Sequence, residues 1–191
     1  MANRQLVFAL ALGATACATM RGYLALREVD FRIDRTANVR LAGIAVEHVR
    51  TIDDLSPIDG LRLAADVARG DVPLVFELHV VGENPAANHV VARLMKMDWT
   101  LLLNGTETIA GSLDTVYTFA PGVATDMAIP IRLNLLQFIR TSGRDAFELA
   151  KGLEGVPARP TRVELRALPT IETPLGGIRY PNAITIVRRT F

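Results

Sequence analysis

Apolar and polar residues alternate along most of this chain. In "REVDFRID", Val29, Phe31 and Ile33 fall on one side, and charged residues fall on the other. Period-two alternation of this kind predicts a strand with one buried face. Further segments with the same pattern are "NVRLAGIAVEHV", "LVFELHVVG", "LMKMDWTLLL", "DMAIPIRLNLLQF" and "TRVELRAL". In the first of these the phase slips at Gly43, which indicates a β-bulge.

Two dipeptides interrupt the strand-rich middle of the chain. Asn84-Pro85 follows the strand that begins at Leu74, and proline cannot donate to a β ladder, so the strand is expected to stop there. Asn104-Gly105 is a strong signal for a tight hairpin, because both residue types tolerate positive φ. Pro130 lies inside an alternating segment, which indicates a strand at the edge of a sheet or a stretch whose N–H side is unpaired.

Two segments have helical spacing instead. Ser56 is a capping residue, Pro57 suits the first helical position and Gly70 suits the end of a helix. We expect the apolar stripe of this helix to close one end or side of the core. The stripe consists of Ile58, Leu61, Ala64, Ala65 and Ala68. A second short helix is expected over residues 141–152, with Phe147 and Ala150 on its inner face.

These elements predict a mostly β fold. Seven to eight antiparallel strands separated by turn signals, plus two short helices, are typical of an immunoglobulin- or fibronectin-III-like β-sandwich. The 191 residues suffice for one domain with a substantial core, and half of them are hydrophobic. We place this domain at residues 28–191.

The first residues have the layout of a secretory signal peptide. Arg4 is followed by an apolar run and then by small residues, and the run is too short to span a bilayer. We therefore expect a signal peptide at residues 1–16 and a lipidated tether at residues 17–27. Cys17, the single cysteine, stands where the acylated cysteine of a bacterial lipoprotein would stand. Ordinary cleavage, which would leave a soluble periplasmic protein, and an uncleaved anchor helix are the alternatives.

Net charge and cysteine content argue against a nucleic-acid-binding protein and against a disulfide-stabilised one. Without Arg4 the chain carries 20 basic and 20 acidic residues, and this balance gives no electrostatic basis for binding nucleic acid. A lone cysteine allows no intramolecular disulfide, so the core must supply the stability. Ala18 and Thr19 follow Cys17 without an aspartate. If the cell has two membranes, the resemblance to sorted lipoproteins implies the periplasmic side of the outer membrane.

Groups suited to catalysis are few and scattered. His79, His89 and Glu83 flank the Asn84-Pro85 step, and a two-histidine, one-carboxylate metal site can be drawn from them. Their spacing does not fix such a site, and we interpret both histidines as solvated surface residues. Of the three serines, Ser112 lies inside an expected strand and Ser56 precedes a helix, so neither has the exposed strained turn of a nucleophile. Trp99 lies on the inward set of its strand and is interpreted as core. The sequence thus predicts no enzyme, cofactor or metal site.

Four motifs, in this order, carry a resemblance to a known family. They are "NVRLAGI", "LVFELHVVGENP", "MDWTLLLNGTETIAGSL" and "MAIPIRLNL". Their order resembles the late-embryogenesis-abundant type 2 family, also called the water stress and hypersensitive response domain, in a bacterial lipoprotein-like member. The family often has Asn-Pro-Asn, and here Ala86 takes the third position. The resemblance implies a β-sandwich associated with desiccation and water stress.

Asn84 and Pro85 have two interpretations: a recognition loop at one end of the sandwich, or a step that only sets the geometry between strands. We expect a non-catalytic, exported protein tethered to a membrane by acyl groups, with a client or envelope protein as partner. The alternative is an accessory or carrier subunit of an envelope complex that binds a partner strand or a hydrophobic ligand. The filling of the core discriminates between a carrier and a protein that acts through its surface.

Overall fold

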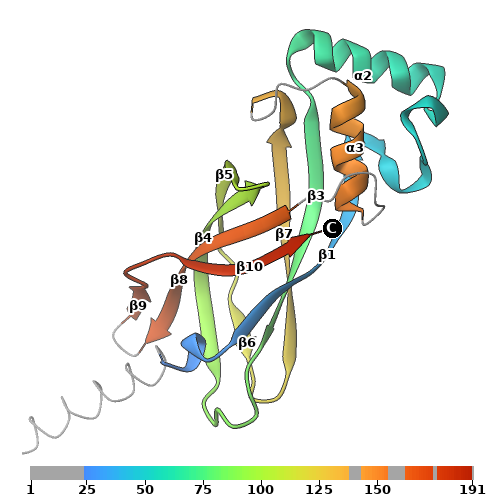
Figure 1. Cartoon of the computed structure of the whole chain (residues 1–191). Helices are drawn as coiled ribbons and strands as arrows, with labels where there is room; N and C mark the ends of the chain where they lie inside the picture. Colours follow the sequence, from blue (N-terminus) through green and yellow to red (C-terminus); the bar gives the residue numbers. More distant parts are fainter. Residues whose placement is uncertain (1–23, 138–142, 155–161, 174–175, 191) are drawn as a thin grey trace, which may run out of the picture.

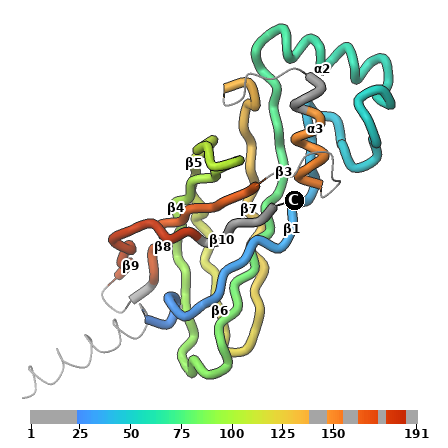
Figure 2. Tube along the Cα trace, viewed as in Figure 1, coloured from blue at the N-terminus to red at the C-terminus, as the bar shows by residue number. Residues whose placement is uncertain are grey.

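The computed structural model describes residues 24–137, 143–154, 162–173 and 176–190. Two antiparallel sheets pack face to face and enclose one core (Figure 1). The predicted β-sandwich is confirmed. In the tube view the chain reverses direction repeatedly between long strands, as expected for an antiparallel fold (Figure 2).

One sheet has four strands in the order β2-β1-β3-β7. Their bounds are β1 Asp30–Leu41, β2 Ile44–Ala45, β3 Pro73–Glu83 and β7 Ala124–Asn134. The β3–β7 ladder runs without a register shift from Pro73 opposite Asn134 to Glu83 opposite Ala124. Strand β7 lies at the end of this sheet and contains Pro130, so the edge position predicted from that proline is confirmed.

The other sheet has six strands, of which four follow the order β10-β8-β4-β5, while β6 pairs with β4 and β9 with β8. Their bounds are β4 Ala92–Leu103, β5 Thr106–Leu113, β6 Tyr117–Phe119, β8 Arg162–Thr173, β9 Gly176–Arg179 and β10 Ile184–Thr190. The described residues thus form ten strands. Strands β2, β6 and β9 have two to four residues each, too few for alternation to identify them in the sequence.

Two tight turns test the sequence signals for reversal. Asn104 and Gly105 have φ of 51° and 83° and join β4 to β5, as predicted. The β-bulge expected at Gly43 is wrong. Ala42 and Gly43 have φ of 51° and 79° and form a two-residue turn, with Leu41 opposite Ile44. A phase slip and a complete reversal leave the same mark on the hydrophobic pattern.

Both helices that the sequence predicted are present, and they lie together at one end of the sandwich (Figure 1). They are α2 Pro57–Arg69 and α3 Gly143–Leu153, and three short 3₁₀ helices are η1 Val46–His48, η2 Ile52–Asp54 and η3 Leu135–Gln137. The Ser56 hydroxyl accepts a hydrogen bond from Asp59 N at 3.1 Å, and Gly70 ends α2 with φ of 73°. In α3, Phe147 and Ala150 are buried as expected.

The predicted orientation of α2 is wrong. All five residues of its apolar stripe are exposed, and Ile58 and Leu61 retain 71% and 73% of their exposure. Leu63 and Asp66 face inward instead. At the end of α2, Asp71 N donates to Asp66 O and the Asn134 amide of β7 donates to Gly70 O, so this end of the helix is fastened to the four-stranded sheet. Among the described residues no helix is both long and apolar enough to cross a membrane.

The space between the sheets is filled by side chains from both. Phe119 is fully buried and meets Phe31 edge to face, with ring centroids 5.4 Å apart. These rings occupy the space over Gly82, where a Cβ would lie 2.6 Å from Phe119 Cε1. Trp99 is buried as predicted and covers Gly111 in the same way. A core packed to this degree leaves no room for a ligand at these positions.

Candidate functional site

The Asn84-Pro85 step lies at the end of the sandwich opposite α2 (Figure 1). Strand β3 stops at Glu83, as the proline predicted, and the Asn84 side chain turns into the protein and is fully buried. Its amide nitrogen donates to Val90 O at 3.0 Å and to Phe119 O at 2.9 Å. Two loops are thereby joined by one side chain.

Asn88 extends this network to the N-terminal part of the domain. Its amide nitrogen donates to Asn84 Oδ1 at 2.8 Å and to Ala25 O at 3.3 Å. Gly122 N donates to the Asn84 carbonyl at 2.7 Å, which attaches the turn between β6 and β7. The two buried asparagines therefore satisfy backbone groups of three segments that would otherwise lack partners.

This geometry limits what the predicted recognition loop can display. Asn84 is inaccessible and Pro85 is half-buried, whereas Ala86 and His89 are exposed. A role in recognition stays a prediction, and exposed loop residues would have to carry it rather than the Asn84 side chain. The other predicted site residue, Cys17, lies outside the described residues.

Asn88 was missed by the sequence interpretation. The only local signal was a second asparagine four positions after Asn84, which is common in any polar loop. Its partner Ala25 lies 63 positions away, and it belongs to the segment expected to be a tether. Ala25 and the neighbouring Leu26 are buried in the core.

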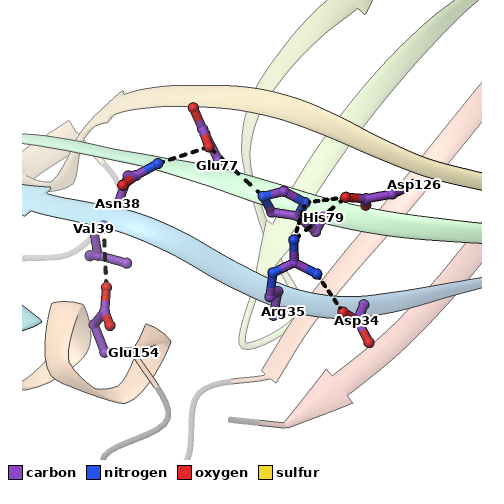
Figure 3. A network of polar contacts seen from close by, with 8 residues as sticks. All are labelled: Asp34, Arg35, Asn38, Val39, Glu77, His79, Asp126 and Glu154. Atoms are coloured by element: carbon purple, nitrogen blue, oxygen red, sulfur yellow. Dashed lines mark hydrogen bonds and ion pairs between the residues drawn. The ribbon is translucent and has the colours of Figure 1, made fainter.

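The outer face of the four-stranded sheet carries a polar network centred on His79 (Figure 3). Its Nδ1 lies 2.8 Å from Asp126 Oδ2 and 3.1 Å from the guanidinium of Arg35, and its Nε2 lies 3.8 Å from Glu77 Oε2. Arg35 also pairs with Asp34 at 2.8 Å. The His79 side chain keeps only 11% of its exposure, so the prediction of a solvated surface histidine is wrong for this residue.

The two contacts of His79 Nδ1 cannot both be hydrogen bonds at the same time. Nδ1 accepts from Arg35 only when it carries no hydrogen, and it donates to Asp126 only when it does. The network therefore has one arrangement when Nδ1 carries no hydrogen and another when it carries one. Asp126 acts on a second neighbour as well: burial, followed by the charge of Asp126, raises the pKa of Tyr117.

The metal site drawn from His79, His89 and Glu83 does not assemble. His79 and Glu83 are four positions apart on β3, about 13 Å along the strand. Glu83 pairs with Arg32 at 3.5 Å, and His79 is held by the network of Figure 3. Within the described ranges no three histidine, cysteine or acidic side chains converge as metal ligands would.

The outer face of the six-stranded sheet has a shallow hollow of about 690 Å³. Two ion pairs cross it: Arg166 to Glu107 at 2.7 Å and Arg179 to Asp98 at 2.6 Å. Ser112 lines the hollow, and its hydroxyl donates to Asp114 at 3.3 Å. Each arginine here already has a carboxylate partner, so a ligand would have to displace a paired charge.

A smaller hollow of about 320 Å³ lies where the two sheets meet at β5 and β7. Ile109 of β5 and Leu133 of β7 line it, beside Asn134. The Asn134 side chain is engaged, since it accepts from Val72 N at 3.1 Å and donates to Gly70 O at 3.0 Å. This hollow is therefore bordered by residues that hold the α2–β3 connection in place.

No family model and no curated protein matches this chain. Several solved structures are similar to it, and three of them are described below. A crystal structure of a protein from Archaeoglobus fulgidus has 18% identity and a TM-score of 0.36, over 62% of this chain and 84% of its own.

The other two are solution structures. One, described as a candidate late embryogenesis abundant protein, has 12% identity and a TM-score of 0.39, over 99% of this chain and 86% of its own. The other, a protein from Arabidopsis thaliana, has 20% identity and a TM-score of 0.37, over 63% of this chain and 70% of its own. Scores at this level describe a loose likeness and establish neither family nor function.

Proposed function

We propose that this chain is a non-catalytic, exported β-sandwich protein, tethered to a membrane through Cys17, that protects envelope components when water is lost. The association with water stress comes from the resemblance of its four motifs to the late-embryogenesis-abundant type 2 family. The motifs fall on β1, β3, the β4–β5 hairpin and β7, which are the long strands of both sheets except β8 and β10.

The observation that carries this proposal is the filled interior. Phe76, Met97, Leu101 and Phe119 each keep no more than 1% of their exposure between the two sheets. Such a core favours a protein that acts through its surface over a carrier that opens to hold an acyl chain. The notion of a sandwich carrying a hydrophobic ligand therefore loses its structural support.

The outer faces suit a protein that works while water is withdrawn. Both carry paired charges, such as Arg35 with Asp126 at 3.5 Å on one sheet and Arg166 with Glu107 on the other. Paired charges keep a surface hydrated and give neighbouring molecules no single sign of charge to bind. Protection would then come from a folded, hydrated surface placed between components that otherwise aggregate.

Drying provides the test. A strain lacking the gene is dried and rehydrated, and its survival is compared with strains that produce the wild-type protein or the Cys17→Ser variant. We expect wild type to restore survival and Cys17→Ser to restore less, because the variant leaves the membrane. Equal survival with and without the gene contradicts the protective role. Intact-mass analysis of the membrane-extracted protein tests acylation of Cys17 separately.

A second candidate is an accessory subunit of an envelope complex. The exposed stripe of α2 favours it, since Ile58, Leu61, Ala65 and Ala68 follow the 3-4-3 spacing with which one helix packs on another. The occupant in that case is a helix of a partner protein. Crosslinking from position 61 in intact cells tests it. One discrete partner, lost in Leu61→Gln, supports a subunit; many partners or none contradict it.

A further inference from the structure

Exposed apolar side chains gather at the Asn84 end of the sandwich. Val90, Val91 and Val123 keep 36%, 46% and 51% of their exposure, and Leu24 keeps 44%. We refer to these four residues as the apolar end. They belong to three segments that are far apart in the sequence, and the loops that carry the valines form the extremity of the molecule away from α2 (Figure 1).

Hydrogen bonds hold these segments in fixed positions. Val90 N donates to Asn88 Oδ1 at 3.2 Å, and Val90 O accepts from Asn84. The turn before Val123 is fastened by Gly122 N on Asn84 O, and Leu24 precedes the carbonyl of Ala25 that accepts from Asn88. The apolar end is thus a preorganised surface rather than a set of loose loops, which lowers the entropy lost on contact with a partner.

The short segment between Cys17 and Leu24 limits how far the apolar end can lie from an anchor on Cys17. Cys17 lies seven positions before Leu24, and seven residues span at most about 25 Å when fully extended. An acyl anchor on Cys17 would therefore hold the apolar end close to the bilayer. Helix α2 precedes the start of β3 and Asn84 follows its end. The eleven residues of β3 span about 36 Å, so α2 lies about that far from the apolar end.

The charges at this end are mixed. Arg27 and Glu28 are adjacent and exposed, Glu83 pairs with Arg32, and His89 is exposed. No excess of basic residues is present among these groups to select anionic lipids. Contact with a lipid surface would depend on apolar side chains that enter the headgroup region, as in shallow interfacial binding.

We propose that the apolar end is a lipid-contacting surface, on which the sandwich stands upright on the membrane with Val90, Val91 and Val123 among the headgroups. This inference rests on the proposed tether at Cys17. The tether alone would leave the domain free to tumble; the apolar end adds an orientation. Helix α2, with its own exposed stripe, is then directed away from the lipid.

The experiment uses an artificial tether, so that its result does not depend on acylation. The chain from residue 17, which contains every residue that the structure describes, carries Cys17→Ser and an N-terminal hexahistidine tag. It is attached to phosphatidylcholine vesicles containing nickel-chelating lipid. A single cysteine is introduced by Val123→Cys, or by Ile58→Cys as the matched control on α2, and is labelled with an environment-sensitive fluorophore.

We expect brominated lipid to quench the label at position 123 at least about threefold more than the label at position 58, because quenching falls off within a few ångströms of the bilayer surface. Neutral vesicles suffice for this result. Equal quenching at both positions, or stronger quenching at 58, overturns the inference. A label at Pro121→Cys is compared with and without the triple substitution Val90→Ser, Val91→Ser, Val123→Ser. The triple variant should lose most of the quenching, and circular dichroism checks that it is folded.

The tether and the orientation fail separately. If intact mass shows no acyl group on Cys17 while the artificially tethered protein is quenched at 123, the lipid-contacting surface stands and the proposed natural anchor is wrong. If Cys17 is acylated and quenching is equal at both labels, the anchor stands and the oriented contact is wrong.

Discussion

The two ends of the sandwich are closed by different means. At the Asn84 end, buried amides satisfy the backbone groups of three segments, and two phenylalanine rings fill the space above Gly82. At the other end, α2 contributes Leu63 and Asp66 to the interior and leaves five apolar residues outside. There Lys151 of α3, itself buried, donates to Val46 O at 3.0 Å.

The two ends should therefore respond differently to substitution, although both expose apolar side chains. The Asn84 end depends on few residues, each with several partners, so single substitutions there should be costly. The face of α2 that points outward is largely exposed, so changes there should be nearly neutral for folding. Substitutions at each end of the sandwich test this contrast.

Asn84→Ala should lower the free energy of unfolding by about 3 kcal/mol, because it removes the donor to Val90 O and Phe119 O and one of the two acceptors of the Asn88 amide. Urea denaturation measures the loss. His89→Ala in the same loop, at an exposed position, serves as the control and should change stability by less than about 0.5 kcal/mol. Equal effects of the two substitutions would show that Asn84 is not the hub of this end.

Gly82→Ala should cost about 2 kcal/mol, since the new Cβ would lie 2.6 Å from Phe119 Cε1 and 2.8 Å from Phe31 Cε1. Phe119 is fully buried, so its ring can move only if neighbouring core side chains move as well. The near-ultraviolet circular dichroism of the aromatic residues should change together with stability. A variant as stable as wild type would mean that the core over β3 is looser than the structure indicates.

Gly60→Ala, the same substitution on α2, should have the opposite sign. A Cβ at Gly60 meets no atom within 4 Å, and alanine is the better helix former, so stability should rise by about 0.5–1 kcal/mol. Thermal and urea unfolding measured beside Gly82→Ala compare the two ends directly. A loss of stability at position 60 would indicate an inward contact of α2 that the structure does not have.

The double variant Ile58→Gln, Leu61→Gln should change stability by less than about 0.5 kcal/mol, because both side chains are exposed and glutamine is a good helix former. Leu63→Gln is the control on the inner face, where 3% exposure predicts a loss of at least about 2 kcal/mol. If the exposed pair proved as costly as Leu63, then α2 packs on the stripe that the sequence predicted.

The sheets could be predicted from the sequence because alternation states directly which residues share a face, and a sandwich needs one inward face on each sheet. The same logic failed for α2. Helical periodicity shows that Ile58 and Leu61 lie together, but not whether their side faces the core. Which side faces the core depends on contacts with distant segments. Asn134 of β7, for example, holds the end of α2 through Gly70 O, beside the bond from Asp71 N to Asp66 O.

The candidate site was predictable in position but not in chemistry. Pro85 marked the end of β3 correctly, since a missing N–H is a local property. The burial of Asn84 depends on Phe119, which is 35 positions away in the sequence. His79 was assigned correctly to the outward set of β3, but Arg35 and Asp126 reach it from two other strands. Contacts of that range leave no trace in a single sequence.

Strand β7, at the edge of its sheet, is poorly suited to pairing with an edge strand of another copy. Eleven aligned pairs tie it to β3 without interruption at Pro130, so the donor that proline lacks is missing from the free side of the strand. When copies of a protein are crowded together, a bare strand edge allows them to pair and to join into fibrils. The gap in that row of donors interrupts any such growth in the middle of the strand.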